Sequence, residues 1–140
     1  MEQKTPPETL MADAKTGLMA GRRGLIMGVA NDHSIAWGIA QVLATQGAEL
    51  AFTYQGDAQA RRLKPLAESI GSKIVLPGDV EKDSDLDAVF AQIGKEWGSL
   101  DFLVHAIAFS DAKELKGRYV DTTRANFLKS LDISCYSFTA

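Results

Sequence analysis

The sequence is poor in cysteine, in clustered basic residues and in long apolar runs. Its 140 residues include one cysteine, Cys135, which excludes an internal disulfide and, without clustered histidines, a structural zinc site. A net charge of −3 without a basic block argues against nucleic acid as the main partner. No apolar run approaches the roughly 18 residues of a membrane span, and no segment has the character of a secretion signal. We therefore expect one globular domain in the cytoplasm, with no bound metal, membrane or nucleic acid.

The most informative stretch is a strand, a glycine turn and a helix start. Leu25–Met27 is an apolar run too short for a helix, which is typical of a strand buried on both faces of a parallel sheet. Gly28 permits a sharp turn and a close approach of a ligand to the backbone. Ser34 is the predicted N-cap of the next helix, which carries one apolar face formed by Ile35, Ile39, Val42 and Leu43.

A helix that begins at this turn suits a pyrophosphate, because its first N–H groups and partial positive charge point at the turn. The usual fingerprint of three closely spaced glycines is absent, since the next glycine after Gly28 is Gly38. Gly38 would let the helix sit close to a strand or a cofactor. Spacing alone leaves a cofactor cradle and an ordinary strand-to-helix turn equally open.

Three further strand and helix units follow. We expect strands at 50–54, 73–77 and 100–105, and helices at about 58–70, from Asp83 or Ser84 to 97, and from Thr122 or Thr123 onward. Pro65 should kink the second helix or mark a second start. Residues 1–22, with no sustained period, read as a flexible N-terminal arm, and residues 23–140 as part of a dinucleotide-binding domain.

Strands that alternate with helices demand a parallel sheet. The predicted fold is therefore α/β, an incomplete Rossmann-like doubly wound sheet of about four strands and four helices. Ligands of such sheets gather at the carboxyl ends of the strands. Each of the four predicted strands is followed by a turn at its carboxyl end. We therefore predict one crevice formed by Gly28, Gln55, Asp79 and Ala106-Ile107.

Several individual side chains at or near the predicted crevice, and others elsewhere, allow a functional or a structural interpretation. Gln55 could hydrogen-bond to an adenosine ribose or be a solvated turn residue, and Asp79 could accept from an adenine amino group or only form a turn. Arg61 and Arg62 could pair with a 2′-phosphate, although a solvated helix face is the more common place for them. We expect His105 to be a core histidine that bonds to backbone rather than a general base. Cys135 is expected in packing.

Four motifs together resemble the NADH-dependent enoyl-acyl carrier protein reductases of bacterial fatty acid synthesis, a branch of the short-chain dehydrogenase/reductase superfamily. They are Gly28-Val-Ala-x3-Ser34-Ile-Ala-x-Gly38-Ile-Ala, Ala-Phe-Thr-Tyr-Gln55, Asp79-Val80 and His105-Ala-Ile-Ala-Phe109. The resemblance runs from about Leu18 to Ala140. It implies NADH as cofactor, an enoyl-acyl carrier protein as substrate and a homotetramer. By position it implies that Ser110 lies near the acyl substrate and that the cofactor contacts Gly28, Ser34, Ile35, Gln55, Asp79, Val80 and Ile107.

The family's reaction also uses a tyrosine, with a lysine seven positions later, and this pair is missing from the sequence. Tyr54 and Tyr119 have Arg61 and Asn126 at that offset, and Tyr136 is too near the end of the sequence to have a partner, so we assign no catalytic residue. We expect the pair beyond Ala140, which makes these residues the cofactor-binding half of a reductase, inactive alone. The alternative is a non-catalytic nucleotide-binding or assembly module of the same superfamily. In either case the fourth strand should form an unpaired sheet edge.

Overall fold

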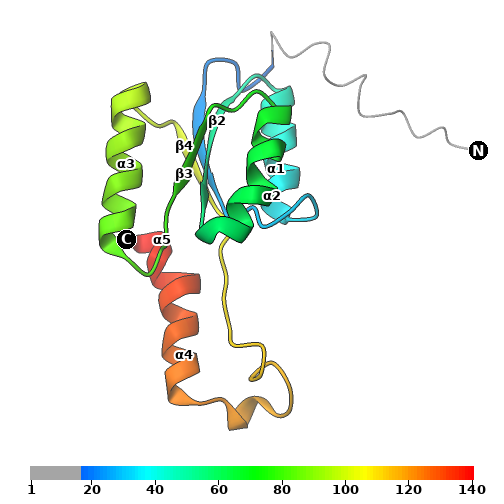
Figure 1. Ribbon diagram of the computed structural model, residues 1–140, viewed down its shortest axis with the longest axis vertical. Coiled ribbons are helices and arrows are strands. Elements are labelled where there is room, and N and C mark those ends of the chain that lie inside the picture. The colour runs from blue at the N-terminus through cyan, green and yellow to red at the C-terminus, as the bar shows by residue number, and fades with distance from the viewer. Residues whose placement is uncertain (1–16) are drawn as a thin grey trace, which may run out of the picture.

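The computed structural model describes residues 17–140, and these residues form a parallel four-stranded sheet with helices on both faces (Figure 1). The strand order is β3-β2-β1-β4 and every pair is parallel. This architecture confirms the predicted fold class. The elements, in chain order, are β1 (Arg23–Met27), α1 (Ile35–Thr45), β2 (Glu49–Tyr54), α2 (Gly56–Ser69), β3 (Ile74–Pro77), α3 (Asp83–Trp97), β4 (Phe102–His105), η3 (Tyr119–Asp121), α4 (Arg124–Leu131), η4 (Asp132–Tyr136) and α5 (Ser137–Thr139).

Most predicted boundaries lie within two residues of the observed ones. Helix α2 runs through Pro65, so this proline does not start a second helix. Gly98 ends α3 in the left-handed region, at φ 73°, as glycine does at this position. The predicted cap of α3 by Asp83 or Ser84 is wrong, because the N-cap is Lys82. Asp83 instead lies in the first turn, where its carboxylate faces the positive end of the helix dipole.

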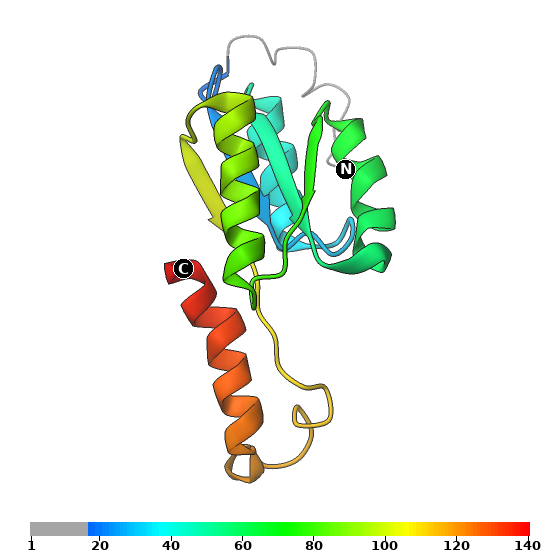
Figure 2. The same cartoon turned by 60° about the vertical axis from the view of Figure 1, so that its left-hand side comes forward.

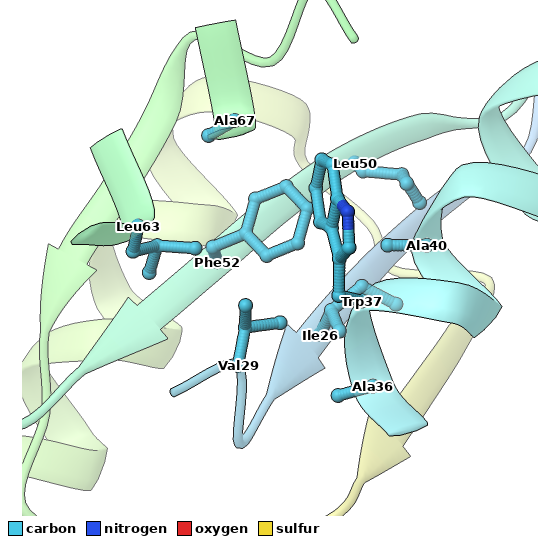
Figure 3. Close-up of a cluster of buried hydrophobic side chains, with 9 residues drawn as sticks. All are labelled: Ile26, Val29, Ala36, Trp37, Ala40, Leu50, Phe52, Leu63 and Ala67. Carbon is cyan, nitrogen blue, oxygen red and sulfur yellow. The ribbon is translucent and has the colours of Figure 1, made fainter. Parts of the chain in front are cut away.

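One face of the sheet packs against α1 and α2, around Phe52 and Trp37. Their ring centroids lie 6.4 Å apart, and both rings are buried (Figure 3). Leu63 and Ala67 of α2 complete this cluster together with Ile26 of β1. A cluster of this kind fixes α1 and α2 on the sheet by removing apolar side chains from water.

The predicted apolar face of α1 is not the side that packs on the sheet, although one of its members, Leu43, packs at the edge of the core. Ile35 and Val42 are 81% and 62% exposed, whereas Ala36, Trp37 and Ala40 face the sheet. The sequence of α1 is apolar almost all round, so its periodicity does not select one stripe. Small alanines on the sheet side let the helix approach closely and leave room for Trp37. Gly38 is exposed, with open space at its Cβ position, so it does not bring α1 close to a strand.

The opposite face packs against α3. Leu86, Val89 and Ile93, one side of α3, are buried against Leu25 and Met27 of β1. Successive β1 residues therefore serve opposite faces, and the whole strand is covered on both sides. This is the doubly wound arrangement that the sequence predicted.

Residues 106–140, here called the C-terminal extension, lie beyond the carboxyl edge of the sheet (Figure 2). An irregular segment leads away from β4, and α4, η4 and α5 return as one continuous helical run. Thr123 is the N-cap, and its hydroxyl accepts a hydrogen bond from the Asn126 N–H at 3.2 Å, which confirms one of the two predicted caps. Cys135 is exposed, so its predicted packing role is wrong.

Strand β4 is the edge of the sheet that the sequence predicted to be unpaired. Among the described residues β4 pairs only with β1.

Of the predicted N-terminal arm, residues 1–16 lie outside the described residues. Residues 17–22 form a turn whose Met19 N–H donates to the Gln46 carbonyl oxygen at 2.9 Å.

Candidate cofactor site

The carboxyl ends of the four strands surround one pocket of about 320 Å³. The predicted convergence of the four strand ends is therefore observed. Five of the predicted cofactor residues line the pocket: Gly28, Gln55, Asp79, Val80 and Ile107. Ser34, Ile35 and Ser110 do not line it. The strand order changes direction between β1 and β4, and residues at the ends of both strands line the pocket, which is the usual ligand position in such sheets.

Gly28 forms the first wall of the pocket. Its φ is +103°, a value that side chains rarely allow, and a Cβ here would overlap the carbonyl oxygen of Ala106. The end of β1 thus contacts the end of β4 through bare backbone. Ala106 N–H also donates to the Met27 carbonyl oxygen at 3.0 Å. Only glycine gives this close approach and leaves the turn open to a ligand.

Ser34 organises the turn after Gly28 but does not cap α1 with its side chain. It occupies the N-cap position, yet its hydroxyl accepts hydrogen bonds from the N–H groups of Ala30 and Asn31, at 3.0 and 3.1 Å. The predicted position is right and the predicted capping bond is absent. Because the hydroxyl points back into the turn, it holds residues 30–31 at the start of α1. Ile35 follows, exposed, at this helix end.

The second wall comes from the end of β2 and the first turns of α2. Gln59 accepts from the Gln55 N–H at 2.6 Å and donates to the Val29 carbonyl oxygen at 2.8 Å. Arg62 donates from Nε to the Ala30 carbonyl oxygen at 2.9 Å. Arg61 and Arg62 are both exposed and do not line the pocket, so they lie on the solvated face of α2, as the sequence favoured.

Asp79 at the end of β3 forms the third wall and is held as a carboxylate. Burial raises its pKa, but hydrogen bonds from the Glu81 N–H and the Gln55 side chain, together with Lys82, lower the pKa below its ordinary value. The Asp79 N–H in turn donates to Asp85 at 3.0 Å. The Asp79 N–H and its Oδ1 both bond within residues 79–85, which confirms the predicted turn role. Asp79 also lines the pocket, and its contact with an adenine amino group stays a prediction.

The fourth wall combines the end of β4 with α4 and η4. Ile107, Phe109, Lys129 and Ile133 line the pocket here, and Lys129 Nζ lies 3.5 Å from Glu81 Oε1. This ion pair joins the turn after β3 to α4, so the C-terminal extension closes one side of the pocket.

Ser110 belongs to the segment that α4 holds in place. Its hydroxyl accepts a hydrogen bond from Asn126 Nδ2 at 3.0 Å, and Asn126 Oδ1 accepts from the Asp111 N–H at 2.9 Å. Ser134 similarly accepts from the Phe109 N–H at 2.9 Å. Side chains of the helical run therefore fix the backbone that leaves the pocket.

His105 is partly buried, as expected, but its partner is a side chain rather than backbone. Its Nε2 lies 2.7 Å from the Ser137 hydroxyl, which donates its hydrogen to the Ile133 carbonyl oxygen at 2.6 Å. Because the hydroxyl has one hydrogen, Nε2 must be the protonated nitrogen in this pair. These hydrogen bonds connect β4 to η4 through Ser137. Because Nε2 already carries a proton, His105 does not act as a base toward the Ser137 hydroxyl.

Sequence reasoning missed several pocket residues. Gln59 lies one helical turn after Gln55, a spacing that could have identified it. Lys129 and Ile133 carry no such signal, because they reach the pocket only through the return of the C-terminal extension. The additional lining residues include Ala30, Tyr54, Gln59, Glu81, Phe109, Lys129 and Ile133.

Two further observations concern the described residues alone. Between residues 17 and 140 no three histidine, cysteine or acidic side chains are grouped so that they could hold a metal ion. No helix in that range is both long and apolar enough to cross a bilayer.

The strand order and the position of the pocket define the class, a Rossmann-like α/β protein. The family model for enoyl-(acyl carrier protein) reductase matches residues 28–140. The chain is 64% identical over 123 residues to enoyl-[acyl-carrier-protein] reductase [NADH] 2 of Rhizobium meliloti (strain 1021), with 88% of this chain and 46% of that protein covered. The chain therefore belongs to the enoyl-(acyl carrier protein) reductase family.

Solved structures agree with this assignment. FabI from Candidatus Liberibacter asiaticus superposes with a TM-score of 0.87 at 54% identity, covering 89% of this chain and 48% of that one. The reductase from Anaplasma phagocytophilum, in complex with NAD, gives a TM-score of 0.85 at 56% identity, covering 89% and 47%. The chain thus spans about half the length of the relatives it matches.

Proposed function

We propose that this chain supplies the NADH-binding half of an enoyl-acyl carrier protein reductase. The observation that carries the proposal is the meeting of four strand ends around one pocket, with Gly28 packed against Ala106. The NADH in the names of the relatives, and the NAD bound to one solved relative, support this cofactor. The pocket of about 320 Å³ is in the range of small-molecule sites.

The cofactor would lie across the ends of the strands. The Gly28 turn and the start of α1, with Ser34 and Ile35, would hold the pyrophosphate, because the turn is open and the first helical N–H groups point there. At the adenosine end, Gln55 would bond to the ribose and Asp79 to the adenine amino group, beside Val80. When bound, the dinucleotide supplies a hydride for the β-carbon of an enoyl thioester.

On the remaining side, Ile107 would border the nicotinamide end and Ser110 the acyl substrate. Ile107 is an apolar wall residue that would exclude water from the reacting centre. The reaction leaves an enolate that needs a hydrogen-bond donor at its oxygen. No Tyr-x6-Lys pair exists in this sequence to supply it. We therefore assign binding to this chain and reduction to groups outside it, with an enoyl-acyl carrier protein as substrate, in a cytoplasmic homotetramer.

Calorimetric titration of the 140-residue chain with NADH tests the binding half of the proposal. We expect saturable binding at one site, lost in Gly28→Ala and retained in Gly94→Ala, whose Cβ meets open space on α3. Absence of binding to the unaltered chain would overturn the proposal. The same preparation should not oxidise NADH when an enoyl thioester is added.

The missing Tyr-x6-Lys pair also favours a second candidate, a nucleotide-binding or assembly module that never performs the reduction. Both candidates predict binding, so titration alone does not separate them. The DNA sequence downstream of the codon for Ala140 does: an in-frame Tyr-x6-Lys pair identifies the reductase, and its absence identifies the module.

A further inference from the structure

One side chain, Gln59, connects two walls of the pocket. Its Oε1 accepts a hydrogen bond from the Gln55 N–H at 2.6 Å, and its Nε2 donates to the Val29 carbonyl oxygen at 2.8 Å. Val29 follows Gly28 after β1, and Gln55 follows the last residue of β2. Both bonds use main-chain groups, so Gln59 holds the two backbone segments together beyond the point where the paired strands end.

The third wall stands beside this link. Asp79 Oδ1 accepts a hydrogen bond from the Glu81 N–H at 3.1 Å, and Gln55 and Asp79 both line the pocket. Gln59 joins the ends of the first two strands and also lines the pocket.

We propose that Gln59 is a positioning residue that sets the adenosine end of the cofactor pocket, an inference that rests on the proposed function. A carboxamide both donates and accepts, and both capacities are used here. Without it, Arg62 still connects α2 to Ala30, but the Val29 carbonyl oxygen and the Gln55 N–H lose the partner they share, and their positions must be fixed when the ligand binds. The entropy lost in fixing these groups then opposes ligand binding, so the affinity falls.

The test compares Gln59→Met, which keeps the length of the side chain but neither hydrogen bond, with the unaltered chain. Each is titrated with NADH and with ADP-ribose, which keeps the adenosine and pyrophosphate but has no nicotinamide. We expect Gln59→Met to weaken both ligands by about tenfold, the effect of one or two lost hydrogen bonds. An equal effect on the two ligands places the role of Gln59 at the adenosine and pyrophosphate part that they share, and not at the nicotinamide.

The matched control is Gln92→Met. Gln92 is a glutamine on α3 whose carboxamide also makes a hydrogen bond, to the Glu96 side chain, but it does not line the pocket. It should leave both affinities within about twofold. A conservative variant, Gln59→Glu, keeps the acceptor for Gln55 but presents an oxygen to the Val29 carbonyl, so we expect it not to restore binding.

A second measurement needs no ligand. Hydrogen exchange at the Gln55 amide should accelerate by about tenfold in Gln59→Met, while amides in the interior of β2 keep their rates. Unchanged affinities or an unchanged Gln55 exchange rate would overturn the role of Gln59 alone. If the unaltered chain binds neither ligand, the proposed function fails, and the role of Gln59 fails with it.

Discussion

The sheet and its helices, residues 23–105, differ from the C-terminal extension in how they are held. The first part buries whole side chains such as Phe52, Leu25 and Ile93. Within the described extension only Ile133 and Ser137 are buried, and large apolar side chains such as Leu115, Tyr119, Val120, Leu128 and Phe138 are exposed. Residues 23–105 are held together by a buried apolar core. The C-terminal extension is held mainly by side-chain hydrogen bonds, and its exposed apolar side chains are unfavourable in water.

The largest contrast should appear when one phenylalanine is removed from each part. We expect Phe52→Ala, at a fully buried position, to lower the free energy of unfolding by about 4 kcal/mol through lost burial and a cavity. Phe127→Ala, at a position 44% exposed, should cost less than about 1 kcal/mol. Denaturant unfolding measures both. Similar losses would mean that the extension has a core of its own.

The junction between the two parts should be nearly as sensitive. Gly28→Ala forces a Cβ against the Ala106 carbonyl at a φ of +103°, so we expect a loss on the order of 3 kcal/mol in the free energy of unfolding. The control Gly94→Ala lies within α3, with open space at its Cβ, and should stabilise by about 0.5–1 kcal/mol. Thermal unfolding distinguishes them, and a neutral Gly28→Ala would show that β1 and β4 can separate there.

Within the extension, the bonds made by Asn126 should matter locally. Asn126→Leu removes its bonds to Ser110 and Asp111, so hydrogen exchange at the Asp111 amide should accelerate by about tenfold. Global stability should fall by no more than about 1 kcal/mol. The neighbouring Ala125→Leu, on an exposed position of the same helix, should change neither quantity.

Acid should act on the sheet part through Asp79. Because hydrogen bonds and Lys82 hold its pKa below the ordinary value, ionised Asp79 stabilises the fold above pH 3.8. That contribution disappears as the pH falls through the lowered pKa. Asp79→Asn should therefore flatten the acid limb of the stability curve below pH 3.8. An unchanged limb in urea titrations at several pH values would contradict this.

The smallest effect is expected from the ion pair that joins the two parts. Lys129 and Glu81 lie 3.5 Å apart with side chains 49% and 32% exposed, so their coupling energy should be below about 1 kcal/mol. A double-mutant cycle with Lys129→Met and Glu81→Gln measures it at low and high salt. Coupling that survives high salt would indicate a firmer closure of the pocket than an exposed pair can give.

The sequence predicted what local patterns determine. Short apolar runs such as Leu25–Met27 identified all four strands of the described sheet, and parallel topology then brought their ends together without further information. The same reasoning found Gly28 and Asp79, because turn residues follow strands directly.

Features that depend on contacts between distant segments were not predictable. The apolar face predicted for α1 did not identify its buried side, because both of its sides are apolar and only packing decides between Ile35 and Trp37. The Ser137 partner of His105 and the pocket position of Lys129 both require the extension to fold back, which no local pattern encodes. Roles of the proposed cofactor residues remain predictions that the titrations test.

Within residues 17–140 no strand pairs with the outer side of β4, and this edge determines how an added strand would lie relative to the pocket. β4 pairs with β1 in parallel register, with His105 opposite Met27, so its outer peptide groups point away from the sheet. A strand added there in the same direction would end beside Ala106 and Ile107. The residues that followed such a strand would stand over the pocket, so that one backbone pairing would both satisfy the free peptide groups and deliver new side chains to the ligand.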